Sequence, residues 1–364
     1  TCYNKVIELN QAYAKAHANL GIIQMELGNL DKAERSYKKV IKLEPANAVA
    51  HTNLGKIQMY LNKIDEALAS QKKAIELKPN YDKAHYNLGE ILVLMGQYRK
   101  AAEEFMLANL SIGKMALLKC WFQLNNQPNF SKLLDEMVNV GMNNAVIGSL
   151  ISRSKTRYGI NKQNPFCEDP LDYVFQTDLS KHYDFKNIFI KPLKKFFDDT
   201  SISNNMSQIL LTNGTQTSGN LFLHKDEMIS EIENIIHLEI EKYKAYFKDS
   251  EEGFLKNWPK SYFLRGWIIK MKNGGKLSPH MHEEGWLSGS IYINVPTKKN
   301  TNNGNLVVCI DDREDEVELY KKPPKIIDVI TGSMCLFPSS LLHYTIPFKA
   351  DEERIVLAFD VIPK

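Results

Sequence analysis

The residues best suited to chemistry in this chain are two histidines that lie two positions apart, His280 and His282, in the stretch SPHMHEEG. Glu284 follows at the same spacing. Successive side chains of a β-strand point to opposite faces, so residues two apart share a face. If this stretch is extended, all three side chains point into one cavity. Imidazole and carboxylate groups in that arrangement can bind a metal ion.

A third histidine and an arginine follow downstream. His343 comes after the stretch GSMCLFPS, and Arg354 opens an apolar run eleven residues later, beyond an acidic turn. Ligands on one face of a metal leave positions open for a cosubstrate and O2, as a non-haem Fe(II) oxygenase requires. A hairpin between His343 and Arg354 would bring both to the same end of a pocket. A guanidinium binds a carboxylate with two parallel hydrogen bonds, so Arg354 is expected to hold the far end of a dicarboxylate.

The third ligand is left open by the sequence. In such oxygenases it is normally a carboxylate two residues after the first histidine, and here that position is His282. The ligands are then three histidines, two histidines with Glu284, or two histidines with water. We favour His280, His282 and His343, with Glu284 as the alternative third ligand. The competing interpretation places His282 beside the metal or against the substrate without coordination.

Residues 279–296 and 332–362 resemble the 2-oxoglutarate/Fe(II)-dependent oxygenase family, through its PHxH…GWLSG…Y and G…FPS…H…PF…ER pattern. The resemblance implies a double-stranded β-helix, iron bound by His280 and His343, and 2-oxoglutarate bound by Arg354. Tyr292 lies in a Tyr-Ile-Asn run similar to the Tyr-Leu-Asn of prolyl hydroxylases, so it is expected to contact 2-oxoglutarate. Aspartyl/asparaginyl β-hydroxylases also join repeats to such a domain and lack the third carboxylate, which keeps a two-histidine site open.

A repeat of 34 residues organises the first part of the chain. The tripeptide Asn-Leu-Gly recurs at 19–21, 53–55 and 87–89, followed in the same phase by small residues and prolines: Ala33, Ala67, Ala101, Pro45 and Pro79. Small residues let paired helices approach closely, and prolines end the second helix of each unit. This pattern resembles the tetratricopeptide repeat. Because Tyr3 and Val6 fall on the second helix of an earlier unit, the array is expected to be truncated at its N-terminus.

Two recurring polar residues receive different predictions. His17, His51 and His85 share one repeat position, so they are expected to pack between helices and not to bind metal. Asparagines at 19, 53 and 87 lie on the first helix of each pair, which in this repeat family lines the concave groove. A protein or peptide partner is expected to bind in that groove.

The domain boundaries follow from changes in pattern. We predict a repeat array at 1–112, a helical cap and linker at 113–164 with a polar junction at 157–165, and an oxygenase domain at 165–364. Short β-type runs dominate the last part, and one amphipathic helix is expected at 226–247. The expected strands are 173–175, 209–212, 264–271, 286–295, 306–310, 326–330, 333–337 and 355–362. The predicted fold is therefore α+β with two domains, an α-solenoid followed by a jelly roll with bracing helices.

Composition limits the function further. The net charge is +3, which gives little reason to expect a nucleic-acid partner, and no stretch is long enough to cross a membrane. The five cysteines are scattered without CxxC pairs, which argues against a disulfide framework and favours a reducing cytoplasm.

These observations predict a dioxygenase that uses Fe(II), 2-oxoglutarate and O2 to hydroxylate a peptide or protein presented with the help of the repeats, with no catalytic side chain beyond the metal ligands. The alternative is a tetratricopeptide interaction scaffold whose jelly-roll domain is catalytically inactive, which the absent third carboxylate favours. A cupin-like metal enzyme that does not use 2-oxoglutarate is a further alternative, and it leaves Arg354 without a role.

Overall fold

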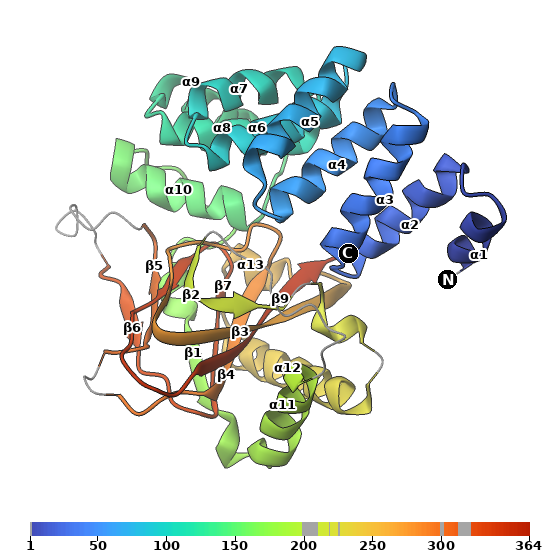
Figure 1. Cartoon of the computed structure of the whole chain (residues 1–364). Coiled ribbons are helices and arrows are strands. Elements are labelled where there is room, and N and C mark those ends of the chain that lie inside the picture. Colours follow the sequence, from blue (N-terminus) through green and yellow to red (C-terminus); the bar gives the residue numbers. More distant parts are fainter. Residues whose placement is uncertain (1, 199–209, 218, 225, 299–301, 312–321) are drawn as a thin grey trace. The chain divides into compact units, whose positions relative to one another are not determined.

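The structure is a computed structural model of the chain that describes residues 2–198, 210–217, 219–224, 226–298, 302–311 and 322–364. Its contacts divide the chain into two compact units, Thr1–Met137 and Val138–Lys364 (Figure 1). The polar stretch 157–165 lies within the second unit, because the helix before it packs Gly148 against Phe166. The division at 112 and 164 stays a prediction.

The first unit consists of paired helices, as the repeats predict. The pairs are joined by short turns, and the helices are α1 Cys2–Leu9, α2 Ala14–Glu26, α3 Leu30–Leu43, α4 Ala48–Tyr60, α5 Ile64–Leu77, α6 Asp82–Leu94, α7 Tyr98–Leu107, α8 Ser111–Gln123 and α9 Gln127–Asn139. A Cβ at Gly89 would come within 2.5 Å of the Phe105 ring, so this glycine lets α6 and α7 touch. The second helices α3 and α5 end two residues before Pro45 and Pro79.

The repeat histidines are structural in this unit. Nε2 of His17, His51 and His85 lies 3.1, 3.0 and 2.7 Å from a backbone carbonyl six residues earlier. Each ring therefore joins the start of its helix to the preceding turn. Of the repeat asparagines, Asn53 donates to the Tyr37 hydroxyl and Asn87 is 2% exposed, so both contribute to packing between helices.

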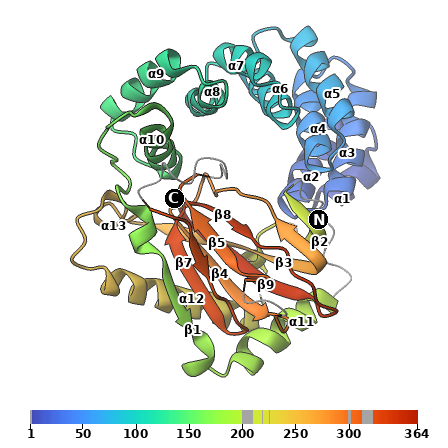
Figure 2. The ribbon, with the colours of Figure 1, turned by 90° about the vertical axis from the view of Figure 1, so that its left-hand side faces the viewer.

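The second unit begins with α10 (Ala145–Tyr158), which the Asn144 side chain caps and Gly159 ends with φ of 66°. The described residues of this unit form two sheets, antiparallel throughout, in the orders β1-β7-β4-β9-β3-β2 and β6-β5-β8 (Figure 2). The strands are β1 Phe175–Asp178, β2 Leu211–Gln216, β3 Tyr262–Leu277, β4 Leu287–Asn294, β5 Leu306–Cys309, β6 Lys325–Ile327, β7 Ser333–Pro338, β8 Leu342–Thr345 and β9 Arg354–Pro363.

The central strands of the larger sheet, β4, β7 and β9, are buried on both faces. One face packs against α12 (Glu227–Tyr246) through alternate residues of β9, namely Leu357, Phe359 and Val361. The helix contributes the side chains that its apolar spacing predicts, Ile229, Ile232, Ile236, Ile240 and Tyr243. The other face of β9 carries Arg354, Val356, Ala358 and Asp360. The side chains of Arg354, Val356 and Ala358 line a cavity. Successive residues of β9 therefore point alternately into the hydrophobic core and toward the candidate site.

Most expected strands are present, with local differences. Tyr173 belongs to a 3-10 helix, Pro170–Tyr173, because Pro170 at its first position favours a helical turn, and β1 begins only at Phe175. Ile209 lies outside the described residues. Strand β8 and the short helices α11 (Lys191–Asp198) and α13 (Gly253–Lys256) were not expected, since segments this short show no clear periodicity. No helix among the described residues has the length and apolarity needed to cross a membrane.

Candidate metal centre

Backbone pairing brings together His280 and His343, which are far apart in the sequence. His280 and His343 form an antiparallel bridge, with N–H···O distances of 3.2 and 2.8 Å in the two directions. Their rings lie 4.2 Å apart between centroids, and His282 completes the group at 5.2 and 4.7 Å. One nitrogen from each ring lies within 4.8 Å of the others, so the three imidazoles converge on one point.

Hydrogen bonds fix which nitrogens face that point. Nδ1 of His280 lies 2.8 Å from the Ser278 carbonyl, which can only accept, so this nitrogen carries the proton. Nδ1 of His282 lies 2.7 Å from Oδ1 of Asp360 and donates to it. Both Nε2 atoms are therefore acceptors, and they lie 3.3 Å apart. Two facing lone pairs repel each other unless a cation or proton lies between them.

The spacing suits a transition metal. Two imidazole nitrogens about 2.1 Å from an ion lie about 3.0 to 3.4 Å apart for angles between octahedral and tetrahedral. His343 contributes a buried ring whose Nδ1 makes no hydrogen bond. Imidazole is a ligand type that suits Fe(II). The residues present thus fit an iron ion bound by three imidazole nitrogens.

The local electrostatics keep two of these rings neutral. Burial lowers the pKa of His280 to about 4, and the neighbouring His282 acts in the same direction. Burial also lowers the pKa of His343 well below its ordinary value, again with help from the other two rings. Because metal ligands must be unprotonated, these rings are ready to coordinate at neutral pH.

Glu284 lies outside this group. The chain turns immediately after His282, where the N–H of Gly285 bonds back to the His282 carbonyl at 3.0 Å, so the strand alternation expected from His280 onward stops there. The Glu284 side chain is 66% exposed and forms an ion pair with Arg265. The structure therefore brings together His280, His282 and His343 and leaves the alternative ligand at the surface.

Arg354 is a buried cation beside the same cavity. It is 2% exposed, and no ion pair to a carboxylate is found for it among the described residues. Its Cζ lies 5.0 Å from the centre of the Tyr292 ring, Nη1 contacts the Met271 sulfur at 3.8 Å, and Nε has no hydrogen-bond partner. Burial lowers the pKa of this guanidinium. A buried charge without a partner is costly, so this position suits an anion from outside the chain.

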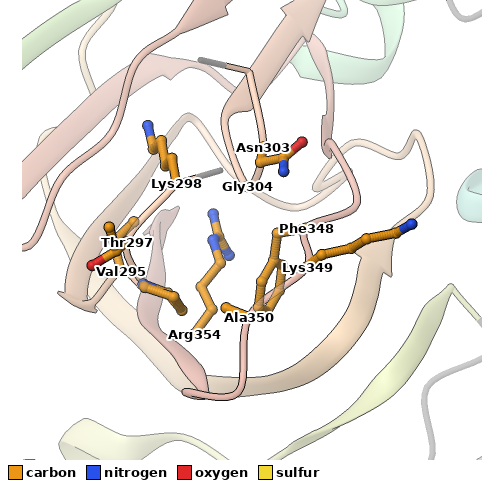
Figure 3. A pocket seen from close by; sticks show the side chains of 10 residues that line it. Val295, Thr297, Lys298, Asn303, Gly304, Phe348, Lys349, Ala350 and Arg354 are labelled. Carbon is orange, nitrogen blue, oxygen red and sulfur yellow. The ribbon is translucent and has the colours of Figure 1, made fainter. Parts of the chain in front are cut away.

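One cavity contains all of these groups. It has about 460 Å³ of space, counting the part open to solvent, and its lining includes His280, His282, His343, Tyr292 and Arg354. Apolar side chains such as Trp267, Leu306, Phe337 and Val356 form the remaining walls. Arg354 also lines a smaller neighbouring cavity, where its guanidinium lies among Thr297, Lys298, Asn303 and Phe348 (Figure 3). The arginine therefore lies at the end of the histidine cavity and joins it to the smaller one.

The burial of Tyr292 shows what its hydroxyl can do. The residue is 1% exposed, and burial raises its pKa above the ordinary value, so it stays a neutral phenol. Ser290 donates to its hydroxyl at 3.2 Å. The hydroxyl can then offer its own proton to an anion at Arg354. Tyr292, expected at the site from the sequence, lines the same cavity as Arg354.

Two kinds of residue at the site were not found from the sequence. Asp360 bonds His282, and Ser288 bonds Asp360 and Ser339 at 2.8 Å each. A signal for Asp360 was present, because an acidic residue stands alone inside the apolar run of β9 with the same parity as Arg354. The serines gave no such signal.

The fold and the site together are antiparallel sheets that enclose three convergent imidazoles, which could hold a metal ion, next to a buried guanidinium. Residues 265–360 match the family model described as "Putative 2OG-Fe(II) oxygenase", and 14–47 and 55–96 match tetratricopeptide repeat models. Family models thus find tetratricopeptide repeats in the first part of the chain and a "Putative 2OG-Fe(II) oxygenase" domain in the last part.

Comparison with solved structures finds repeat proteins. MamA is 22% identical, with 38% of this chain and 83% of that chain covered and a TM-score of 0.36. YrrB, whose title describes a TPR protein with an unusual peptide-binding site, is 18% identical, with 44% and 84% covered and a TM-score of 0.39. PilF of Pseudomonas aeruginosa is 20% identical, with 43% and 74% covered and a TM-score of 0.39. No curated protein matches the chain.

Proposed function

We propose that this protein is a dioxygenase that uses Fe(II) and 2-oxoglutarate to hydroxylate a peptide or protein, on a jelly-roll domain. The observation that carries the proposal is a single cavity lined by three convergent imidazoles and a buried guanidinium without a carboxylate partner among the described residues. The match of 265–360 to the oxygenase family supports the same activity. The tetratricopeptide repeats support a protein or peptide substrate.

The chain's own residues have separate tasks in this proposal. His280, His282 and His343 would hold Fe(II), and Arg354 with the Tyr292 hydroxyl would bind the distal carboxylate of 2-oxoglutarate. Bound Fe(II) and 2-oxoglutarate supply the oxidising power that inserts an oxygen atom from O2 into a substrate C–H bond, with release of succinate and CO2. The apolar walls around Trp267 and Phe337 would limit the access of water to the reacting groups.

The test is an anaerobic titration of the full chain with Fe(II) and then with 2-oxoglutarate. We expect a visible metal-to-ligand charge-transfer band that reports 2-oxoglutarate on the metal. His343→Ala removes one converging nitrogen, so the band should disappear, while the repeat variant His51→Ala should retain it. A wild-type chain that binds Fe(II) without producing the band would contradict the cosubstrate assignment and favour a metal enzyme of another kind.

The alternative, an interaction scaffold with an inactive jelly roll, makes a different prediction. It requires no Fe(II) binding and no conversion of 2-oxoglutarate to succinate. The pre-arranged Nε2 atoms, 3.3 Å apart, favour the enzyme. We further propose that the enzyme works in the cytoplasm, which is supported by the absence of disulfide bonds among the five cysteines, four of them buried.

A further inference from the structure

Asp360 is a buried acid at an unexpected place. It is 4% exposed and lies between Phe359 and Val361, whose side chains enter the core on the opposite face of β9. Among the described residues its ion-pair partner is the His282 ring, and neither a lysine nor an arginine pairs with it. A buried carboxylate is costly without a compensating positive charge. Arg265, which lies opposite Asp360 in the pairing of β3 with β9, pairs instead with Glu284, so a cation at the point where the three imidazoles converge would supply that charge.

The geometry prevents Asp360 from binding that same ion directly. Its Oδ1 is 2.7 Å from Nδ1 of His282, whereas Nε2 of that ring faces His280. Nδ1 and Nε2 of an imidazole point in different directions. The Asp360 carboxylate therefore lies on one side of the His282 ring, and the point where the three imidazoles converge lies on the other. Asp360 therefore acts on a bound cation only through His282.

Neighbouring hydroxyls hold the carboxylate in this position. Ser288 lies directly opposite Asp360 in the pairing of β4 with β9, and its Oγ donates to Oδ1 at 2.8 Å. Oγ of Ser288 also lies 2.8 Å from Oγ of Ser339, which follows β7. Ser288 thus restricts the carboxylate directly, Ser339 does so through Ser288, and the carboxylate restricts the ring.

We propose that Asp360 is the positioning residue that makes His282 a metal ligand. Its carboxylate holds the proton on Nδ1, directs the Nε2 lone pair to the ion, and supplies through the imidazole the negative charge that a coordinating carboxylate would otherwise supply. A carboxylate bonded to a ligand histidine orients the ring and raises its basicity. The inference rests on the proposed function, because it requires a metal at the three histidines.

The test measures metal binding without turnover. The full chain, freed of metal, is titrated with Co(II), whose visible absorption bands report the number and type of ligands. Asp360→Asn removes the charge but keeps an acceptor oxygen of the same shape, and we expect a loss of Co(II) affinity on the order of 10- to 100-fold, with altered bands. The matched control is Glu239→Gln. Glu239 is another buried acid, which lies on α12 and accepts a hydrogen bond from the Tyr183 hydroxyl. Because it does not contact the three histidines, its neutralisation should leave Co(II) affinity unchanged.

A double-mutant cycle separates positioning from general structural damage. In a His282→Ala background, Asp360→Asn should cause no further loss of Co(II) affinity, because the imidazole through which Asp360 acts on the metal is absent. An equal loss with and without His282 overturns the proposal, and so does unchanged affinity in the single variant. If wild type itself binds no Co(II), the proposed function fails instead.

Should Asp360→Asn not fold, Ser288→Ala decides the question. This variant keeps the carboxylate but removes one hydrogen bond that holds it. We expect a several-fold loss of Co(II) affinity that disappears in the His282→Ala background, and unchanged affinity overturns the proposal.

Discussion

Three imidazoles and one guanidinium carry the proposed chemistry, and the contacts of each side chain determine what it can bind. His280 and His282 have their protons held on Nδ1, so both present acceptors to the cavity. The Nε donor of Arg354, in contrast, has no hydrogen-bond partner among the described residues, so it is available to an anion from outside the chain. The site therefore offers lone pairs at one end and N–H donors at the other, which matches a cation and an anion bound side by side.

Arg354→Met should separate cosubstrate binding from metal binding. If the guanidinium pairs with a carboxylate of 2-oxoglutarate, truncating one partner of this buried pair costs about 2–5 kcal/mol, or roughly 30- to several-thousand-fold in affinity. Arg354→Lys should recover only part, because an ammonium lacks the planar two-pronged contact. The measurement is 2-oxoglutarate titration at fixed Fe(II), with Fe(II) affinity measured separately and expected to be near normal.

The control for this experiment is Lys349→Met. Lys349 is exposed, and its side chain points away from Arg354 (Figure 3). Equal 2-oxoglutarate affinity in wild type and Arg354→Met would show that the anion binds elsewhere.

Glu284→Ala should leave Fe(II) affinity unchanged, because this side chain pairs with Arg265 at the surface. His282→Ala should weaken Fe(II) binding by at least about 10-fold, because even the loss of a residue that only hydrogen-bonds to a metal ligand has an effect of this size. Both variants are compared by chelator competition. The reverse order of effects would restore a carboxylate as the third ligand.

The buried histidines predict acid sensitivity of the metal-free protein. The folded pKa of His280 is about 4, whereas a free histidine titrates near 6.5. Between these values the unfolded chain binds a proton that the folded chain refuses, so stability is complete above pH 6.5 and falls as the pH drops toward 4. The loss from His280 is roughly 3 kcal/mol, and His343 adds to it in the same direction.

Urea unfolding between pH 7.5 and 4.5 tests this expectation. Tryptophan fluorescence reports mainly the second unit, which contains Trp258, Trp267 and Trp286. His280→Gln should flatten the pH dependence, while His51→Gln should not change it. Identical slopes in wild type and His280→Gln would exclude His280 as the cause.

At the scale of elements, the pairing of β4 with β9 builds the site. Gly289 and Phe359 are directly opposite across these strands, and a Cβ at Gly289 would lie 2.2 Å from the Phe359 ring. The Phe359 ring packs over Gly289 on the core face. This packing keeps Ser288 directly opposite Asp360 on the other face. This explains a glycine within a buried strand.

Gly289→Ala should therefore lower the free energy of unfolding by about 1–3 kcal/mol, because the core must accommodate an added methyl group. Phe359→Leu should also destabilise the protein, by loss of buried area. The double variant should be less destabilised than the sum of the two, since the smaller side chain makes room for the methyl group. Simple additivity in chemical denaturation would show that the ring does not limit position 289.

At the scale of the whole molecule, the chain consists of two units with separate cores. The residues of the candidate metal site all belong to Val138–Lys364, and the matched repeats all belong to Thr1–Met137. Repeat arrays are stabilised mainly by contacts between neighbouring repeats. The two units can therefore carry separate parts of the function.

Removing residues 1–137 should leave Fe(II) and 2-oxoglutarate binding at the level of the full chain. Uncoupled conversion of 2-oxoglutarate to succinate should persist, while turnover of the native substrate should fall because the repeats no longer present it. The comparison uses the charge-transfer band and succinate release. Loss of the band in a folded truncated chain would contradict this separation of tasks.

The sequence by itself determined the local and periodic features of this protein. The 34-residue repeat was readable because each helix pair makes the same contacts, and family models confirm it. The helix around Ile229 to Tyr243 was readable because its apolar spacing follows the helical period. A site at His280, His343 and Arg354 was predicted from residue type and order, and the "Putative 2OG-Fe(II) oxygenase" model matches the stretch that contains them.

Only the tertiary structure decided which side chains share the cavity. The turn after His282 sends Glu284 to the surface, and a two-residue spacing cannot show where a strand stops. Strand β8, which carries His343, is four residues long and shows no readable alternation. Asp360 reaches His282 across 78 positions of sequence through the pairing of β4 with β9. Such contacts depend on the register between distant strands, which no local pattern of residues specifies.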